Sequence, residues 1–332
     1  MPLLTSDVPL CEAHDLVMLD LDGVVYVGAD AVPGASDALE LCVSHGARIA
    51  YLTNNAARPA GEVAQHLRDL GMPVHDDGEV VTSAQAVARM IAADLPSGSR
   101  VLVVGGPGLR EPLEAAGLVC VDSAEDDPAA VVQGFHRDIG WRHLAEAAYA
   151  VAAGLPYYAS NLDLSIPTPR GTAPGNGTLV RAVVAATGRE PLVAGKPERP
   201  LFDETLRRTA AQRPLMVGDR VDTDIDGATR AGIPALAVLT GVSDLAELAA
   251  LAPERRPGYV SHDLRGLVDH HLAVVVDGDT SRCGDSTAER RDGTVVLTGG
   301  DPAATTSVRA VLGLAWSAVD AGHDAPDVRL GG

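Results

Sequence analysis

The chain has 332 residues, of which 46% are hydrophobic and 3% aromatic, so its core must be built mainly from aliphatic side chains. This length suits two domains and a short appendage. The net charge of −19, without a basic patch, argues against nucleic acid or an anionic membrane as a partner, because their counterions would not be displaced.

The first 96 residues alternate between strand and helix patterns. Apolar runs predict strands over 14–19 and 48–52. Helical spacing of apolar residues predicts helices over 36–44, 59–70 and 82–95, with Ser83 as the candidate N-cap of the last one. This order is typical of an α/β domain.

A second alternating block follows. Strands are expected over 101–104, 129–132 and 157–159, and helices over 141–152 and 178–187. The glycine run at 105–108 resembles a nucleotide-binding loop but lacks the complete G-x-G-x-x-G pattern and its acidic partner. Taken alone, this block could also continue one long sheet.

The first pattern resumes after residue 190. A helix over 200–211, strands over 215–217 and 235–239, a helix over 226–231 and an edge strand at 259–260 are expected. Together with the first strands they predict a doubly wound parallel sheet.

The last 60 residues have a different pattern of apolar and polar segments. Two apolar, β-branched segments at 273–276 and 294–297 could pair as a hairpin, and helical spacing covers 305–321. The segment resembles a fragment of an acetyltransferase-like fold without a complete cofactor loop. A structural or oligomerising extension is the preferred interpretation, so a homo-oligomer is a possible assembly.

The beginning of the chain and its cysteines carry no targeting or metal pattern. A signal peptide and a bilayer-spanning run are not evident, so a cytoplasmic location is expected. The four cysteines, Cys11, Cys42, Cys120 and Cys283, are scattered without metal-ligand spacing and are expected to be free buried thiols.

Four short motifs occur in a fixed order, and three of them directly follow a predicted strand. They are Asp-Leu-Asp-Gly at 20–23, Leu-Thr-Asn-Asn at 52–55, Gly-Lys-Pro at 195–197 and Gly-Asp-Arg-Val-Asp-Thr-Asp at 218–224. Ligands bind at the carboxyl ends of the strands in open α/β sheets, so these side chains are expected at one rim. Several carboxylates there predict a hard cation such as Mg²⁺, and the lysine predicts a bound phosphate.

Each motif by itself is also compatible with a turn or a helix start. The first one begins like a calcium loop, but positions five and twelve of such a loop would be Val24 and Ala31, which offer no suitable side-chain oxygen. The order, spacing and strand context of the whole set favour phosphoryl chemistry.

These motifs, with Val-Pro-Gly-Ala at 32–35, Ser-Asn-Leu-Asp at 160–163 and Gly-Thr-Ala-Pro-Gly-Asn-Gly at 171–177, resemble haloacid dehalogenase (HAD) superfamily phosphatases. The subgroup is the NagD-like and p-nitrophenyl phosphatase-like proteins, and the resemblance covers about 14 to 270. Gln133-Gly134-Phe135 and Gly140-Trp141 look most like actinobacterial-type glycerol-3-phosphate phosphatases. The resemblance implies a core domain at 1–96 and 190–272, an inserted α/β C2-type cap domain at 97–189, and an extension at 273–332.

The resemblance also implies roles for the motif residues. Asp20 would be the nucleophile that forms an aspartyl-phosphate, and Asp22 the general acid and base. Lys196 would neutralise charge on the phosphoryl group, while the Thr53 hydroxyl and the Asn54 N–H would bind its oxygens. Magnesium would be held by Asp20, the Asp22 carbonyl and Asp219, with Asp224 acting through water or orienting the lysine. Asp222 and Asp226 are expected to be surface acids.

The expected reaction is Mg²⁺-dependent hydrolysis of a small phosphomonoester, with glycerol 3-phosphate as the first candidate substrate. Four cap residues are candidates for contacts to a polyol, although each also suits a turn or a surface: Asn161, Asp163, Arg170 and Asn176. Alternatives are a broad-specificity p-nitrophenyl phosphate, phosphoglycolate or nucleotide phosphatase. Of other classes, a phosphotransferase or mutase and a non-catalytic phosphate-sensing module remain open.

Overall fold

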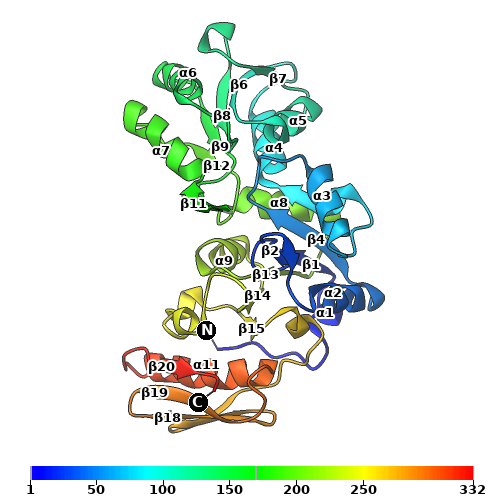
Figure 1. Ribbon diagram of the computed structural model, residues 1–332, viewed down its shortest axis with the longest axis vertical. Helices are drawn as coiled ribbons and strands as arrows, with labels where there is room; N and C mark the ends of the chain where they lie inside the picture. Colours follow the sequence, from blue (N-terminus) through cyan, green and yellow to red (C-terminus); the bar gives the residue numbers. More distant parts are fainter. Residues whose placement is uncertain (1, 169, 332) are drawn as a thin grey trace. The chain divides into compact units, whose positions relative to one another are not determined.

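The computed structural model describes residues 2–168 and 170–331 and divides into two compact units (Figure 1). Unit 1 comprises Met1–Ala50, Leu70–Pro73 and Thr209–Gly332. Unit 2 comprises Tyr51–Asp69 and Val74–Arg208. Each unit has its own parallel sheet, so the predicted α/β class is confirmed.

Unit 1 contains four parallel strands in the order β15-β14-β13-β1, and the first residues of β4 follow β1. Almost every residue in them is buried, as expected for strands covered on both faces. Leu19 lies opposite Val217, so β1 and β13 end at the same edge. The strands are β1 (Leu16–Leu19), β4 (Arg48–Thr53), β13 (Pro214–Gly218), β14 (Ala235–Val238) and β15 (Tyr259–Ser261).

Short helices and one small hairpin complete this part of unit 1. The helices are α1 (Leu10–Ala13), α2 (Ala35–Ser44), α9 (Asp226–Ala231) and α10 (Leu245–Ala249), with a π-helical turn at Val221–Ile225. The hairpin consists of β2 (Tyr26–Val27) and β3 (Asp30–Ala31). Single helical turns occur at Pro253–Arg255 and Leu264–Leu267.

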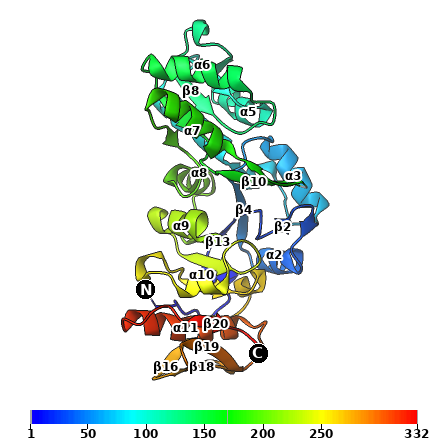
Figure 2. The same cartoon turned by 60° about the vertical axis from the view of Figure 1, so that its left-hand side comes forward.

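The C-terminal segment of unit 1 forms a five-stranded sheet in the order β16-β17-β18-β19-β20, and α11 lies across one face (Figures 1 and 2). The predicted hairpin between 273–276 and 294–297 is wrong. The first of these segments pairs instead with the polar stretch that follows it. The elements are β16 (Val275–Asp277), β17 (Thr280–Cys283), β18 (Ser286–Arg291), β19 (Thr294–Gly299), α11 (Thr305–Asp320) and β20 (Asp327–Arg329).

Unit 2 contains a second parallel sheet in the order β12-β9-β8-β6-β7. Two helices, α6 (Trp141–Ala152) and α7 (Asn176–Thr187), pack on it through an aliphatic core that includes Val131, Val151 and Val180. The strands are β6 (Arg100–Val104), β7 (Val119–Val121), β8 (Ala130–Gln133), β9 (Tyr157–Ala159) and β12 (Leu192–Val193).

The other helices of unit 2 include α4, which packs against α5 and β9 (Figure 1). The end of β4 pairs in parallel with β5, and β10 and β11 form a hairpin. The bounds are α3 (Ala60–Asp69), β5 (Val80–Thr82), α4 (Ser83–Asp94), α5 (Pro107–Ala115), β10 (Ser165–Thr168), β11 (Gly171–Pro174) and α8 (Arg199–Thr209), with single turns at Asp77–Glu79 and Ala124–Asp126.

Two local predictions need correction in unit 2. The N-cap of α4 is Thr82, not Ser83, because the Thr82 hydroxyl accepts from the N–H of Gln85 while the Gln85 side chain accepts from the N–H of Thr82. This reciprocal pair is a capping box. The glycine run at 105–108 leads into α5, a helix that the sequence did not predict.

The cysteines agree with their prediction: all four thiols are free, three of them are buried, and Cys120 is half-buried. Among the described residues, no helix combines the length and apolarity needed to cross a membrane. The predicted domain limits at 97, 189 and 273 remain a prediction.

Candidate functional site

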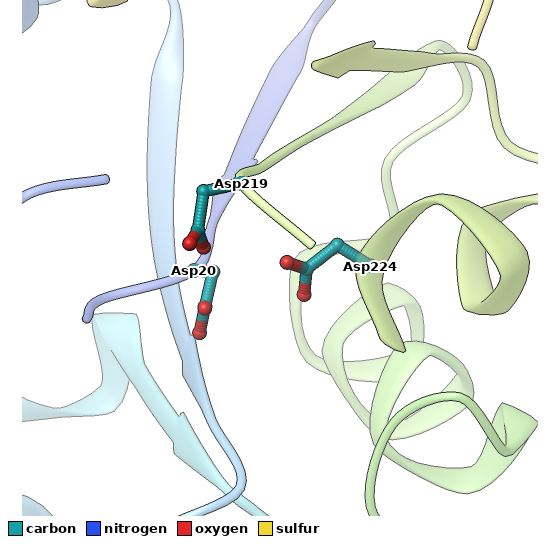
Figure 3. Close-up of side chains that lie close together, drawn as sticks. All are labelled: Asp20, Asp219 and Asp224. Atoms are coloured by element: carbon teal, nitrogen blue, oxygen red, sulfur yellow. The ribbon is translucent and has the colours of Figure 1, made fainter. Parts of the chain in front are cut away.

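Three carboxylates predicted to act together lie together in unit 1. Asp20, Asp219 and Asp224 each offer an oxygen, and these oxygens lie within 4.8 Å of one another (Figure 3). Asp20 directly follows β1, Asp219 directly follows β13, and Asp224 lies in the π-helical turn after β13. Parallel pairing of β1 with β13 therefore brings the first and last motifs to the same strand ends.

Backbone groups orient the two buried carboxylates. Asp219 is 1% exposed and its Oδ2 accepts from the N–H of Val242 at 2.7 Å. Asp224 is 0% exposed and its Oδ2 accepts from the N–H of Arg220 at 3.1 Å. These backbone hydrogen bonds fix the direction in which each carboxyl group points.

Glycines leave the space that these carboxylates occupy. A Cβ at Gly23 or Gly241 would collide with the carboxylate of Asp219, and one at Gly218 would collide with the side chain of Asp224. Gly23 also has a φ of +88°, a conformation that residues with side chains rarely adopt. The glycine in each acidic motif is therefore required by the position of the acid.

The cluster fits a hard divalent cation. Three carboxylates at this spacing repel one another, and burial of two of them raises the cost of leaving their charge uncompensated. Magnesium takes oxygen ligands of this kind and keeps positions for substrate oxygens. Asp22 is exposed and is not part of this side-chain cluster, so its predicted role as acid, base and carbonyl ligand remains a prediction.

The two neighbouring acids have other partners. Asp222 is exposed and pairs with Arg220 at 2.8 Å. Asp226 begins α9 and pairs with Arg255 at 2.7 Å. Asp222 is therefore a surface acid as expected, whereas Asp226 is half-buried beside Arg255.

The remaining motif residues lie in unit 2, where Asn54 is joined to the lysine motif. Asn54 Oδ1 accepts from the N–H of Lys196 at 2.8 Å, and Asn54 Nδ2 donates to the Lys196 carbonyl at 3.1 Å. Lys196 is 3% exposed. The sequence predicted a backbone role for Asn54 but not this side-chain pairing, which joins residues 142 positions apart.

Thr53 is the last residue of β4 and is buried. Its Oγ1 accepts from the N–H of Asn55 at 3.0 Å, which fixes the hydroxyl at the strand end. The Asn54 carbonyl accepts from the Ser83 hydroxyl at 2.6 Å, so the first turn of α4 also holds this loop.

Two of the four candidate cap residues extend this network inside unit 2. Asn161 Nδ2 donates to the Asn54 carbonyl at 2.6 Å, and Asn176 Nδ2 donates to the Asn161 carbonyl at 2.8 Å. Both side chains are buried. Their amides therefore position the 160–163 loop, a role that the sequence did not predict.

The other two cap candidates are more accessible. Asp163 is half-buried and its Oδ1 accepts from Asn54 Nδ2 at 3.3 Å. Arg170 is exposed in the turn between β10 and β11. Contact of any of the four with substrate remains a prediction.

Comparisons with known families give two matches. A model described as haloacid dehalogenase-like hydrolase matches residues 17–119, and one described as HAD-hydrolase-like matches residues 193–267. These ranges contain all four motifs.

Curated relatives are phosphatases. A D-glycerol 3-phosphate phosphatase of Mycobacterium tuberculosis is 46% identical over 258 residues, covering 78% of this chain and 72% of that protein. An acid sugar phosphatase of Staphylococcus haemolyticus is 36% identical and covers 74% of this chain and 92% of its own.

Solved structures similar to this chain also include phosphatases. A glycerol phosphate phosphatase of Mycobacterium tuberculosis in complex with magnesium has a TM-score of 0.85 at 40% identity, covering 97% of this chain and 95% of that chain. A 4-nitrophenylphosphatase of Thermotoga maritima has a TM-score of 0.72 at 31% identity and covers 78% of this chain and 98% of its own. The family models end at residue 267, in agreement with the predicted limit near 270, whereas the first structural match extends into the C-terminal segment.

Proposed function

Because this chain belongs to the haloacid dehalogenase-like hydrolases and is a phosphatase of that family, we propose that it hydrolyses glycerol 3-phosphate to glycerol and phosphate with Mg²⁺ as cofactor. The observation that carries the choice of substrate is the 46% identity to a D-glycerol 3-phosphate phosphatase, which covers most of both chains. The polar composition of the 157–178 loops agrees with recognition of hydroxyl groups.

Asp20 is the nucleophile in this proposal. Its carboxylate attacks phosphorus, the bond between phosphorus and the glycerol oxygen breaks, and an aspartyl-phosphate forms. Asp22 gives a proton to the leaving alkoxide and then takes one from the water that hydrolyses the intermediate. Its exposed side chain is accessible for both transfers.

The loops of unit 2 supply phosphate contacts in this proposal. The Thr53 hydroxyl and the Asn54 N–H bind phosphoryl oxygens, and Lys196 neutralises the charge that develops on them. The paired hydrogen bonds between Asn54 and Lys196 support these roles, because they fix the lysine motif to the loop that carries the other two groups.

Asp20, Asp219 and Asp224 would hold the magnesium, with the Asp22 carbonyl as a further ligand. When bound, Mg²⁺ supplies charge neutralisation and alignment for the phosphoryl group. The hydrogen bonds to Asp219 and Asp224 and the surrounding glycines support this assignment, since they hold two anionic ligands in place.

A panel of small phosphomonoesters tests the substrate. Glycerol 3-phosphate, phosphoglycolate, a sugar phosphate, a nucleoside monophosphate and p-nitrophenyl phosphate are compared by kcat/KM with Mg²⁺. Glycerol 3-phosphate is expected to rank first. A higher value for a sugar phosphate would favour the activity that the staphylococcal relatives are named for and would overturn the substrate but not the phosphatase assignment.

Two other assays separate the remaining classes. A mutase or phosphotransferase would return the phosphoryl group to a second alcohol, so stoichiometric release of inorganic phosphate excludes it. A sensing module would bind beryllium fluoride as a phosphate analogue without turnover. A cytoplasmic location and a possible homo-oligomer belong to the same proposal.

A further inference from the structure

Unit 2 has a cavity of about 340 Å³ that is separate from every residue assigned above to chemistry. Its walls come from the start of α3, from α4 and α5, and from the last turns of α8. We call it the arginine pocket, because Arg89, Arg207 and Arg208 line it. This volume lies at the lower end of the range for small-molecule sites, roughly 300–1,000 Å³.

The charged lining is arranged around Glu204. Its side chain is buried and pairs with Arg207 at 2.9 Å and with Arg208 at 2.7 Å. Burial alone would raise the pKa of the Glu204 carboxyl, but the hydrogen bonds from both arginines outweigh burial and lower that pKa. Glu204 therefore stays ionised and holds the two guanidinium groups in fixed directions.

The arginine pocket has a net positive lining in an acidic protein. Besides Glu204, one more acid lines it, Glu111, so three cations face two anions. Arg89 is exposed and has no ion pair within residues 2–168 and 170–331. An excess of one positive charge suits a singly charged anion, and a guanidinium binds a planar carboxylate through two parallel hydrogen bonds.

The rest of the wall is apolar, since it consists mainly of alanine and proline side chains. We propose that the arginine pocket binds a short aliphatic monocarboxylate and that this binding changes the affinity of the phosphate-binding loop. The inference rests on the proposed function for its second part only, because Thr53 and Asn54 are there assigned to phosphate.

The coupling follows from elements shared by the pocket and that loop. Thr82 and Gln85 line the pocket, Thr82 pairs with Thr53 in the β4–β5 register, and the adjacent Ser83 hydroxyl donates to the Asn54 carbonyl at 2.6 Å. Gln85 Oε1 also accepts from Arg208 Nη1 at 3.2 Å. Arg208 therefore links the pocket to the α4 turn that holds Asn54.

A second contact runs through α5. Gly108 lines the pocket, and a Cβ there would lie 2.7 Å from backbone atoms of Ala56, Ala57 and Arg58. The start of α5 thus packs backbone against backbone on the residues that follow Asn54. Close packing of this kind transmits small displacements rather than absorbing them.

Calorimetric titration of the full-length protein with butyrate tests the site. We expect measurable binding that Arg89→Ala weakens about tenfold and that Ala115→Trp, which fills the pocket, removes. Arg142→Ala is the matched control, because Arg142 is an exposed helical arginine of unit 2 outside the pocket. Failure of butyrate to bind to the wild type would overturn the site. Binding of butyrate to both pocket variants with the wild-type Kd would also overturn it.

Two further probes test the ligand class. Butanol, which has the same apolar body without the charge, is expected not to bind. Inorganic phosphate binds the loop rather than the pocket, so it is expected to change the Kd for butyrate by no more than the coupling factor, about fivefold, and to reach a limit at high concentration. Displacement of butyrate that continues without limit as phosphate rises would show direct competition and would overturn the carboxylate assignment.

Kinetics with p-nitrophenyl phosphate test the coupling. Saturating butyrate is expected to change KM about fivefold in the wild type and in Arg142→Ala but not in Ala115→Trp, whose pocket is filled. Binding without any change in KM would overturn the regulatory part. Because the ester is not glycerol 3-phosphate and the titration needs no turnover, a wrong substrate assignment leaves both results interpretable.

Discussion

Asp20 is the residue on which the proposed chemistry depends most directly. Asp20→Asn keeps the size of the side chain but cannot form an acyl-phosphate, so turnover is expected to fall by at least about 10³-fold. Asp222→Asn is the control, because Asp222 is an exposed acid of a neighbouring motif that pairs with Arg220. The measurement is kcat, with circular dichroism to show that both variants fold. Activity of Asp20→Asn within about tenfold of wild type would remove Asp20 from the nucleophile role.

Asp219 provides the corresponding test of the metal site. Asp219→Asn can still accept the N–H of Val242 but loses the negative charge, so the Mg²⁺ concentration for half-maximal activity is expected to rise at least about tenfold. Asp226→Asn, which affects an acid paired with Arg255, is expected to leave it unchanged. Full wild-type activity in excess chelator would contradict the metal assignment.

His271 gives a prediction about pH. The ring is buried, Nε2 lies 2.7 Å from the Gly266 carbonyl and Nδ1 lies 3.1 Å from the Arg309 guanidinium. A neutral ring donates through Nε2 and accepts at Nδ1, whereas a charged ring would direct an N–H at Arg309. Burial first, with help from Arg309, lowers the pKa of His271 to about 4 despite the Gly266 hydrogen bond.

The lowered pKa of His271 determines the direction in which the free energy of unfolding changes with pH. Between pH 6.5 and about 4 the unfolded chain binds a proton at His271 that the native state does not, so acidification favours unfolding. The free energy of unfolding is expected to fall by up to about 3 kcal/mol over this range. Urea titrations check it: His271→Gln should flatten the dependence, and His270→Gln, at an exposed neighbour, should retain it. An unchanged slope in His271→Gln would contradict the assignment.

The motifs predicted which acids come together because both acidic motifs directly follow a strand of a parallel sheet. Asp20 and Asp219 needed only the strand pattern and the rule that parallel strands end at one edge. The side-chain pairing of Asn54 with Lys196 was beyond prediction, since neither residue type nor spacing signals a contact across 142 positions. Asn161 and Asn176 remain candidate substrate contacts, but no sequence signal predicted the hydrogen bonds that their buried amides make within unit 2.

At the scale of elements, α11 connects the C-terminal sheet to the rest of unit 1. One side of the helix packs on the small sheet, where the Ser281 hydroxyl donates to the Ala310 carbonyl at 2.7 Å. The other side contacts α10 and β15, where Trp316 Nε1 donates to the Leu248 carbonyl at 2.7 Å. Removing 273–332 would therefore expose part of the unit 1 core.

Trp316 allows a gentler test than deletion. It is 3% exposed, and the Arg256 guanidinium lies 5.0 Å from its ring centroid. Trp316→Ala is expected to lower the free energy of unfolding by about 3–5 kcal/mol, because it leaves a cavity and removes the hydrogen bond to the Leu248 carbonyl. Val275→Ala, at a 64% exposed position of the same segment, should change it by less than about 0.5 kcal/mol. Equal effects would show that α11 does not stabilise unit 1.

Sequence patterns predicted the long helices well and the C-terminal strands poorly. Apolar spacing gave α6 and α11 within one residue at each end, because a helix with one buried face has a strong period. The inward residues of β17 and β18 are small and partly polar: Ser281, Cys283, Ser286 and Ala288. The buried serine hydroxyls are satisfied by hydrogen bonds. Because these inward positions are not apolar, the sequence shows no alternation of apolar and polar residues in these strands.

At the scale of the whole molecule, the proposed cap limits of 97 and 189 can be set against the sheet of unit 2. Strand β12 pairs with β9 at the sheet edge and lies beyond residue 189. Helix α4 lies before residue 97, packs on α5 and β9, and accepts a hydrogen bond from the Tyr158 hydroxyl at Asp94 Oδ2, 2.7 Å away. A domain that folds alone would need both elements.

Two fragments test where the folding unit ends. A fragment of residues 82–196 retains the capping box of α4, its buried face and the β12 edge strand, so we expect a cooperative thermal unfolding transition. A fragment of residues 97–189 leaves β9 as a bare edge and exposes the apolar surface beneath α4, so we expect aggregation or a transition without cooperativity. Circular dichroism and size-exclusion chromatography make the comparison. Equal cooperativity in both fragments would favour the narrower limits, because α4 and β12 would then contribute nothing that the inserted domain needs to fold.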